Sequence, residues 1–309
     1  MEKINKIAVL CGGSSSEREI SIQSGEGVYK SIIELGYIAD LIDINDLEGF
    51  KELREYDFVF IALHGFEGED GTLQKCLDDL NILYTGSGPK CCKNTWNKKL
   101  AKKILKQNNI NTPLWSEVSK LPSYDSPDAK FSAKYFDKFR PFDAIFLKPQ
   151  EDGSSIDIFK ITNEESNRNA IKACSNPNRG FIYEEYIEGK EFTVTIVDDE
   201  CFPPIEIISK NEFYDYDAKY LSDETILKEA KLNRNELIEI NKIATDAFKA
   251  LNCDGWARVD LIQGRDGKFY VIEINTVPGM TGHSCVPKSG SFLGLSYNEV
   301  VKKIIDAAF

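Results

Sequence analysis

The feature that most constrains the fold is a pair of strand-like segments near the end of the chain. Residues 257–262 and 268–275 alternate apolar and polar side chains around an Asp-Gly dipeptide at 266–267. That dipeptide favours a tight turn between antiparallel strands. If it forms the turn, Asp260 lies directly opposite Glu273. The alternation then turns inward the apolar side chains Val259, Leu261, Ile272 and Ile274.

The polar face of this predicted hairpin is rich in oxygen ligands. Arg258 would lie opposite Asn275, beside the facing carboxylates of Asp260 and Glu273. Carboxylate and amide oxygens suit Mg²⁺ or Mn²⁺, which bind through carboxylates and substrate phosphates. We therefore expect a site for a metal–nucleotide complex, with a Pro- and Gly-rich loop at 276–284 beside it. The alternative is a surface hairpin whose charges are simply solvated.

Composition indicates a soluble globular protein that does not bind nucleic acid. The 309 residues are 42% hydrophobic, and 38 Lys and Arg face 50 Asp and Glu, for a net charge of −12. An acidic surface disfavours nucleic acids and anionic membranes as partners. The start lacks a signal-peptide core, and no stretch is long enough to span a bilayer. Eight cysteines without a CxxC pair indicate reduced thiols, so we expect a cytoplasmic location.

Strand and helix patterns alternate in the N-terminal part of the chain. Strands are predicted at 6–10 and 57–63, and helices around 28–33 and 72–80. This alternation indicates a doubly wound parallel sheet, in which ligands gather at the carboxyl ends of the strands. The loops that carry Glu17 and His64 lie at those ends. Later elements are a helix at 93–107, strands at 144–149, 180–187 and 191–197, and a helix near 235–251.

A Gly-Ser loop at residues 11–17 follows the first predicted strand and opens a helix. Its backbone amides could cradle an anion. Ser16 and Glu19 have the spacing of a capping box, which offers a purely structural explanation. Glu17, at the helix start, could instead receive a substrate ammonium group.

Three further segments suit a nucleotide. Lys148 with the loop at 153–155 resembles a mobile loop that covers phosphates. The alternative is a plain turn that connects two strands. Glu184 and Glu191 flank Tyr186 and Ile187, a pattern that suits an adenine and ribose slot. Taken singly, each of these four is more typical of an exposed acid or a core aromatic residue. The polar and aromatic segment 213–220 could fold over a site, or could be an edge strand.

Taken in order, these segments resemble the D-alanine–D-alanine ligases of the ATP-grasp superfamily, over the whole chain. The markers are Gly12-Gly13, Glu17-Arg18-Glu19-Ile20-Ser21, Leu63-His64-Gly65, Gly68-Glu69-Asp70-Gly71, Lys148-Pro149, Gly153-Ser154-Ser155, Phe213-Tyr214-Asp215-Tyr216, Ala218-Lys219-Tyr220, Arg258-Val259-Asp260, Glu273-Ile274-Asn275-Thr276, Pro278-Gly279-Met280-Thr281 and His283-Ser284. The resemblance implies an α/β, three-domain ATP-grasp fold, in which ATP is gripped between the central and C-terminal domains. We expect an N-terminal doubly wound domain at 1–90, a central subdomain at 91–184 and a C-terminal subdomain at 185–309.

The reaction that the resemblance implies joins two D-alanines at the expense of ATP, for peptidoglycan precursor synthesis. The first carboxylate attacks the γ-phosphate and gives an acyl phosphate. The second amino group then attacks the activated carbonyl, and phosphate leaves. The resemblance also implies a cytoplasmic homodimer.

The resemblance carries roles over to individual residues. Asp260, Glu273 and Asn275 would hold two Mg²⁺ or Mn²⁺, and Arg258 with the Gly279 amide would steady an oxyanion. The phosphates of ATP would contact Lys98, Lys148, Ser155 and Lys219. Its adenine would contact Glu184, Tyr186 and Ile187, and its ribose would contact Glu191. The amino-acid substrates would contact Glu17 and His64 at the first position and Ser284 and Cys285 at the second. Ser154 and Tyr220 would join Glu17 in a hydrogen-bonded triad.

Some positions depart from the family pattern, and two alternatives stay open. Asn97 stands where aspartate is common, Asp157 replaces a small residue, Tyr186 replaces tryptophan, and Cys285 replaces leucine. The acceptor could be D-serine or D-lactate, although Lys219-Tyr220 favours an amine. A non-catalytic nucleotide-binding module on the same scaffold is the other alternative.

Overall fold

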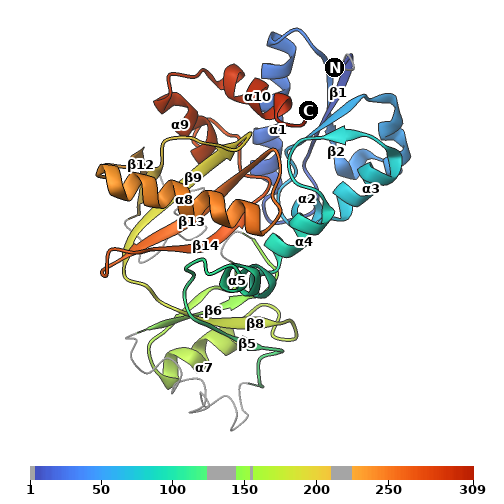
Figure 1. Cartoon of the computed structure of the whole chain (residues 1–309). Coiled ribbons are helices and arrows are strands. Elements are labelled where there is room, and N and C mark those ends of the chain that lie inside the picture. Colours follow the sequence, from blue (N-terminus) through green and yellow to red (C-terminus); the bar gives the residue numbers. More distant parts are fainter. Residues whose placement is uncertain (1–3, 124–143, 154–155, 210–224) are drawn as a thin grey trace.

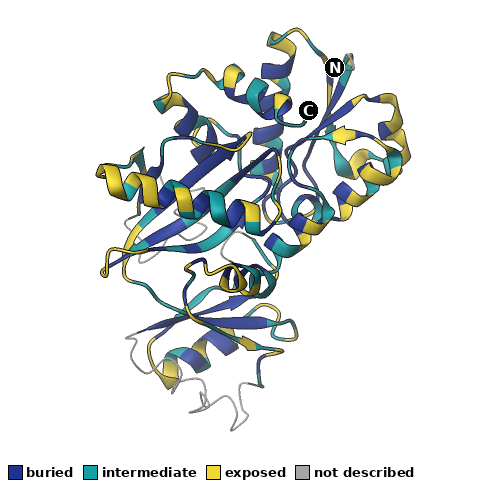
Figure 2. Ribbon diagram, in the orientation of Figure 1, coloured by how far each residue is buried: buried dark blue, intermediate teal, exposed yellow. Residues whose placement is uncertain are grey.

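The computed structural model describes residues 4–123, 144–153, 156–209 and 225–309 (Figure 1). Three β-sheets organise these residues, formed by strands within 6–84, 115–185 and 189–275. The predicted α/β class with an N-terminal parallel sheet is confirmed, and the two sheets that follow are antiparallel. The inner strands of the sheets are largely dark blue in Figure 2, because most of their side chains are buried, whereas the outward face of α8 (Arg234–Ala250) is exposed.

The N-terminal sheet is parallel throughout, with strand order β2-β1-β3-β4. Its elements are β1 (Lys6–Cys11), α1 (Arg18–Glu34), β2 (Ile38–Asp43), the 3-10 helices η1 (Ile44–Asp46) and η2 (Phe50–Glu55), β3 (Phe58–Ile61), α2 (Phe66–Glu69), α3 (Thr72–Leu80) and β4 (Leu83–Tyr84). Strand β2 was not predicted, because its partly exposed residues form no apolar run. The order reverses between β1 and β3, so the crevice beyond their carboxyl ends is the expected ligand position.

Both faces of this sheet are buried, as a doubly wound arrangement requires. Ile7 and Val9 of β1 join one hydrophobic core, whereas Ala8 and Leu10 join another on the opposite face. This division follows from the two-residue period of a strand. The continuous apolar run of β1 is therefore explained by helices on both sides.

The central sheet has strand order β5-β8-β6-β7 and is antiparallel. The elements here are α4 (Pro89–Trp96), α5 (Lys98–Gln107), β5 (Trp115–Val118), β6 (Ile145–Pro149), β7 (Phe159–Ile161), α7 (Glu164–Ala173) and β8 (Phe181–Glu185). The single helix predicted at 93–107 is wrong. Asn97 has an extended backbone, ends α4, and caps α5 by accepting the Leu100 amide at 3.0 Å.

The C-terminal sheet has strand order β12-β11-β9-β13-β14, with β10 paired to β9. The elements are β9 (Gly189–Val197), β10 (Glu200–Cys201), β11 (Ile205–Ile208), β12 (Ile226–Glu229), α8 (Arg234–Ala250), β13 (Trp256–Gly264), β14 (Phe269–Asn275), α9 (Cys285–Phe292) and α10 (Tyr297–Asp306). Apolar side chains of α8 cover one face of β9, β13 and β14. This packing leaves the opposite face of the hairpin for the polar residues.

The predicted hairpin register is confirmed at the two residue pairs that carry the predicted site residues. Asp260 pairs with Glu273, and Arg258 pairs with Asn275. The register shifts after Asp260, so that Leu261 pairs with Val271. This bulge turns Ile272 to the pocket side, so the prediction that Ile272 lies on the inner face is wrong.

The C-terminal helices return to the N-terminal sheet. In Figure 1, α10 lies beside α1, and its apolar residues share one core with both β1 and β3. The ring centroids of Phe60 and Trp256 lie 6.1 Å apart, and those of Phe58 and Phe309 lie 5.5 Å apart. Residues from the two ends of the chain therefore form a common core, which sets the hairpin against the crevice of the N-terminal sheet. In the described part of the chain, no helix combines the length and the apolar character needed to cross a membrane.

We predict that Gly68→Ala destabilises the fold. A Cβ on Gly68 would lie 1.7 Å from the Leu63 carbonyl oxygen, so backbone would have to move. Overpacking of this kind costs about 1–3 kcal/mol. Gly49→Ala is the matched control, since its backbone is extended and no atom lies within 4 Å of the added carbon. Denaturant unfolding measures both variants, and equal stabilities would contradict the packing argument.

Candidate active site

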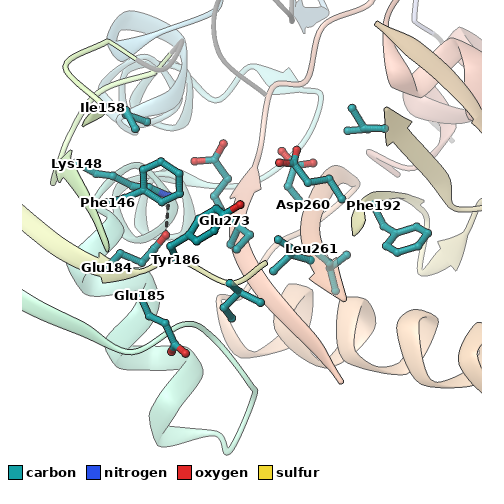
Figure 3. Close-up of a pocket in the computed structure, with 15 residues that line it drawn as sticks. Phe146, Lys148, Ile158, Glu184, Glu185, Tyr186, Phe192, Asp260, Leu261 and Glu273 are labelled. Atoms are coloured by element: carbon teal, nitrogen blue, oxygen red, sulfur yellow. Dashed lines mark hydrogen bonds and ion pairs between the residues drawn. The ribbon is translucent and has the colours of Figure 1, made fainter. Parts of the chain in front are cut away.

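A pocket lies between the central and C-terminal sheets, and it collects many of the residues predicted to bind a nucleotide. Figure 3 shows Lys148, Glu184 and Tyr186 on one side, with Asp260 and Glu273 facing them. The predicted binding residues that line it are Lys148, Glu184, Tyr186, Ile187, Glu191, Asp260 and Glu273. Apolar side chains complete the wall: Phe146, Ile158, Phe192, Ile207, Leu261, Ile262 and Ile272. An apolar slot with carboxylates at one end suits a flat ring system with a polar tail.

The aromatic wall of the pocket comes from strand β6 and from the residue that follows β8. The rings of Phe146 and Tyr186 meet edge to face, 5.6 Å apart. The Lys160 ammonium lies 4.0 Å from the centre of the Tyr186 ring. Tyr186 is thus held in place from two sides, although the family more often has tryptophan there.

The hairpin residues form a connected polar cluster. Arg258 donates from Nε to Asp260 Oδ1 at 2.9 Å and from a terminal nitrogen to Oδ2 at 2.8 Å. Thr193 also donates to Asp260 Oδ1, at 2.7 Å. The two side chains are largely buried, so this bidentate pair orients both of them.

The donor set fits a hard divalent cation. Asp260 and Glu273 face each other across the ribbon, and Asn275 follows two residues later on the same face. Asn275 Oδ1 accepts the Val277 amide at 3.0 Å, which fixes the orientation of its side chain. Two carboxylates and one amide oxygen leave the remaining positions to water and phosphate, as Mg²⁺ prefers. Among the described residues, no group of three or more His, Cys, Asp or Glu is arranged as a metal site.

His64 holds the hairpin loop against the N-terminal sheet. Its Nδ1 lies 2.9 Å from the Val277 carbonyl and its Nε2 lies 3.1 Å from Ser24 Oγ. Because a carbonyl only accepts, Nδ1 is the donor, and Ser24 donates to Nε2 while accepting the Met280 amide at 3.0 Å. Burial lowers the pKa of His64 although the charge of Glu17 opposes this, so the ring is neutral. Both ring nitrogens are thus occupied by the protein itself.

Glu17, at the start of α1, lies between the loop after β3 and the loop after β6. Its side chain is buried, and two glycines from other segments lie close to its carboxylate. A Cβ on Gly153 would lie 2.7 Å from Glu17 Oε2, and one on Gly65 would lie 3.6 Å from it. The loop after Lys148 therefore approaches Glu17, as the predicted triad requires. The other triad members, Ser154 and Tyr220, and the predicted ATP ligands Ser155 and Lys219, lie outside the described residues.

The Gly-Ser loop does not form the predicted anion cradle. Its amides are used by side chains of the protein: Gly12 donates to Ser21 Oγ at 2.9 Å, Gly13 to Asp43 at 3.2 Å and Ser14 to Glu67 at 2.6 Å. The capping-box prediction is also wrong, because α1 begins at Arg18 and its N-cap is Glu17 instead of Ser16.

The predicted acceptor residues lie at the start of α9. Ser284 precedes this helix, and its Oγ accepts the Thr281 amide at 3.0 Å. A Cβ on Gly279 would lie 2.9 Å from the same oxygen, so only glycine fits without displacing it. Cys285 is buried as the first residue of the helix. The loop 279–284 therefore folds back on itself beside the hairpin.

The loop after Lys148 is anchored at both ends. Lys98 donates to the Asp152 carbonyl at 2.6 Å, and Asn97 donates to Glu151 Oε1 at 2.6 Å. Asp157, with φ of 54°, pairs with Arg179 at 2.5 Å. Arg179 also pairs with Asp152. Asn97 and Asp157, which depart from the family pattern, thus hold this loop.

Glu69 is a site residue that the sequence argument did not assign, although it belongs to a quoted marker. It ends α2 and accepts the Gly65 amide at 3.0 Å. Burial, together with the negative charges of Glu17 and Glu273, raises its pKa to about 8. At neutral pH it is therefore mostly a neutral carboxylic acid. Spacing alone could not reveal this crowding, because the three acids come from distant segments.

We predict that Glu69 makes stability depend on pH. Its pKa is near 4.5 when unfolded and about 8 when folded, so folding takes up a proton between these values. Stability from this group is therefore lost as pH rises from 4.5 to 8. Relative to the unaltered chain, Glu69→Gln should become progressively more stable over this window. Urea unfolding at pH 5, 6.5 and 8 in metal-free buffer measures this, and a constant difference between the two proteins would contradict it.

The fold and the site together define an ATP-grasp ligase. Two family models match, described as the D-ala D-ala ligase N-terminus at residues 43–87 and the D-ala D-ala ligase C-terminus at residues 104–306. The chain belongs to the D-alanine–D-alanine ligase family.

Individual relatives agree over nearly the full length. A D-alanine–D-alanine ligase from a Marinomonas species is 36% identical over 316 residues, covering 99% of this chain and 96% of that protein. The structure of a D-alanine–D-alanine ligase from Bacillus anthracis complexed with ATP is 30% identical. It has a TM-score of 0.84 and covers 98% of this chain and 97% of that one. A D-Ala:D-Ser ligase structure from Enterococcus faecalis is 26% identical, has a TM-score of 0.83 and covers 99% and 100%.

Proposed function

We propose that this chain is an ATP-dependent ligase that joins two D-alanines to D-alanyl-D-alanine, supplying peptidoglycan precursor synthesis. The observation that carries the proposal is the hairpin register, which sets Asp260 against Glu273 with Arg258 beside them, at the end of an apolar pocket. Family membership and the ATP complex of the Bacillus anthracis relative support it.

The pocket residues would bind ATP. The apolar wall and Tyr186 would enclose the adenine, Glu191 would take the ribose hydroxyls, and Lys148 would contact the phosphates. Lys98, Ser155 and Lys219 would add phosphate contacts. Burial of the ring between Tyr186 and the apolar side chains of β9 and β13 would aim the triphosphate at the hairpin.

Asp260, Glu273 and Asn275 would hold two Mg²⁺ or Mn²⁺, which supply charge neutralisation during phosphoryl transfer. Arg258, oriented by its bidentate contact with Asp260, would place a fixed positive charge beside the developing oxyanion. The Gly279 amide would donate to the same oxygen.

Glu17 would hold the ammonium of the first D-alanine, with His64 close by. Ser284 and the Cys285 amide, at the start of α9, would hold the carboxylate of the second. Ser154 and Tyr220 would join Glu17 as the triad that orders the covering loop. The first carboxylate would then meet the γ-phosphate beside the hairpin, and the second amino group would attack the resulting acyl phosphate.

A different acceptor is the second candidate function. The D-Ala:D-Ser ligase from Enterococcus faecalis has nearly the same TM-score as the Bacillus anthracis ligase, so the backbone fold does not discriminate between acceptors. Cys285 stands where the family usually has leucine, which changes the acceptor end of the site. Lys219-Tyr220 favours an amine over D-lactate.

A product assay tests these alternatives together. The chain is incubated with ATP, Mg²⁺ and, side by side, D-alanine, L-alanine, D-serine or D-lactate. D-alanine should give the dipeptide, ADP and phosphate, with little product from the others. Mixed products would support the second candidate, and nucleotide binding without any product would identify a non-catalytic module.

The remaining partners and the domain division are also proposals. Resemblance to the family supports a homodimer that works in the cytoplasm and binds neither nucleic acid nor membrane. The three domains would be 1–90, 91–184 and 185–309. Light scattering of the purified chain measures the oligomeric state directly.

We predict that Glu273→Ala reduces phosphate release to background, because one of the two facing carboxylates disappears. Glu239→Ala, on the exposed face of α8, is the matched control and should keep normal turnover. Phosphate release in the presence of D-alanine and Mg²⁺ is the measurement. Near-normal turnover of the Glu273 variant would refute the metal assignment.

Arg258→Ala should slow turnover by about 100- to 1000-fold, the usual loss when one oxyanion donor is removed. The KM for ATP should change little, because Arg258 lies outside the adenine pocket. Steady-state kinetics with ATP and D-alanine varied separately distinguish kcat from KM. A defect confined to the KM for ATP would contradict the oxyanion role.

A further inference from the structure

One lysine without an assigned role is almost completely buried beside the nucleotide pocket. Lys102 of α5 has 1% of its surface exposed. Its ammonium lies 2.5 Å from Glu184 Oε2, and it donates to Thr112 Oγ1 at 2.8 Å. A buried lysine is rare and requires a partner that compensates for the lost water. The carboxylate of Glu184 is that partner.

Glu184 is shared between two lysines. Its second oxygen, Oε1, accepts from Lys148 at 2.5 Å. Lys148 and Glu184 both line the pocket, whereas Lys102 does not. The carboxylate of Glu184 is therefore held by the two lysines, and its backbone pairs with β5 and β6 on either side, so Glu184 contributes to the predicted adenine slot as part of its wall.

The arrangement explains how Lys148 can be both fixed and available. With Lys102 on one carboxylate oxygen, Glu184 holds Lys148 through the other oxygen alone. Without Lys102, the buried carboxylate of Glu184 would have to pair with Lys148 through both oxygens. The ammonium of Lys148 would then be drawn away from the pocket. Burial lowers the pKa of Lys102, and the charge of Glu184 opposes this. Burial also disfavours the charged form of Glu184, but the two lysines outweigh it and keep its pKa low.

We propose that Lys102 is a positioning residue for ATP: by holding one oxygen of Glu184, it lets Lys148 present its ammonium to the phosphates. The inference rests on the proposed function, in which Lys148 contacts the nucleotide. Lys102 itself touches no substrate. Its influence passes entirely through Glu184, and this makes the proposal testable by a double-mutant cycle.

The experiment measures ATP binding by calorimetry, without D-alanine, in the full chain. Lys102→Met replaces the amine with an apolar side chain of similar length, and should raise the Kd for ATP about tenfold, equivalent to about 1.4 kcal/mol. Lys103→Met, the next residue of the same helix but exposed, should leave the Kd unchanged. The KM for D-alanine should not move in either variant.

The second variant, Lys102→Met with Glu184→Gln, separates positioning from packing. Once Glu184 is neutral, Lys148 is no longer withdrawn, so the double variant should bind ATP within about threefold of Glu184→Gln alone. A further tenfold loss would show that Lys102 acts by packing, and would overturn the proposal. This comparison stands even if Lys102→Met alone fails to fold. An unchanged Kd in Lys102→Met would also overturn the proposal. If the unaltered chain does not bind ATP at all, the proposed function is refuted instead.

Discussion

The antiparallel pairing of β13 with β14 is the constraint on which the rest of the site depends. One hydrogen-bonded ribbon sets Asp260 opposite Glu273 and Arg258 opposite Asn275, and the apolar residues beneath it are covered by α8. Because side chains alternate along a strand, a slip of one residue would turn the carboxylates into the core. The bulge after Asp260 adds a local correction, since it sends Ile272 to the pocket wall beside Glu273.

Contacts between distant segments place this ribbon against the N-terminal sheet. The C-terminal helix α10 fills the same core as β1 and β3, and His64 clamps the loop after the ribbon through Val277 and Ser24. The clamp requires a neutral imidazole with one donor and one acceptor nitrogen, which burial provides. The loop that follows the hairpin is consequently fixed against the loop after β3 and against α1.

Buried glutamate side chains with shifted pKa values are a common electrostatic feature of the site. Burial, reinforced by the charges of Glu17 and Glu273, raises the pKa of Glu69, whereas two lysines share the oxygens of the buried Glu184 and keep its pKa low. These opposite outcomes for two glutamates come from their neighbours. Both arrangements depend on helices α2 and α5 meeting strands that are far away in the sequence.

Local patterns in the sequence were sufficient for the α/β class, the doubly wound start and the register of the hairpin, because alternation and turn chemistry act over a few residues. They also identified Lys148, Glu184, Tyr186, Glu191, Asp260 and Glu273, which the structure gathers around one pocket. The same reasoning failed for the Gly-Ser loop, whose amides are used by Ser21, Asp43 and Glu67, and for the helix at 93–107, which Asn97 divides. Only the tertiary structure decided the bulge at Ile272, the acidity of Glu69 and the burial of Lys102. Each of these depends on which distant side chain becomes a neighbour, and spacing along the chain carries no record of that.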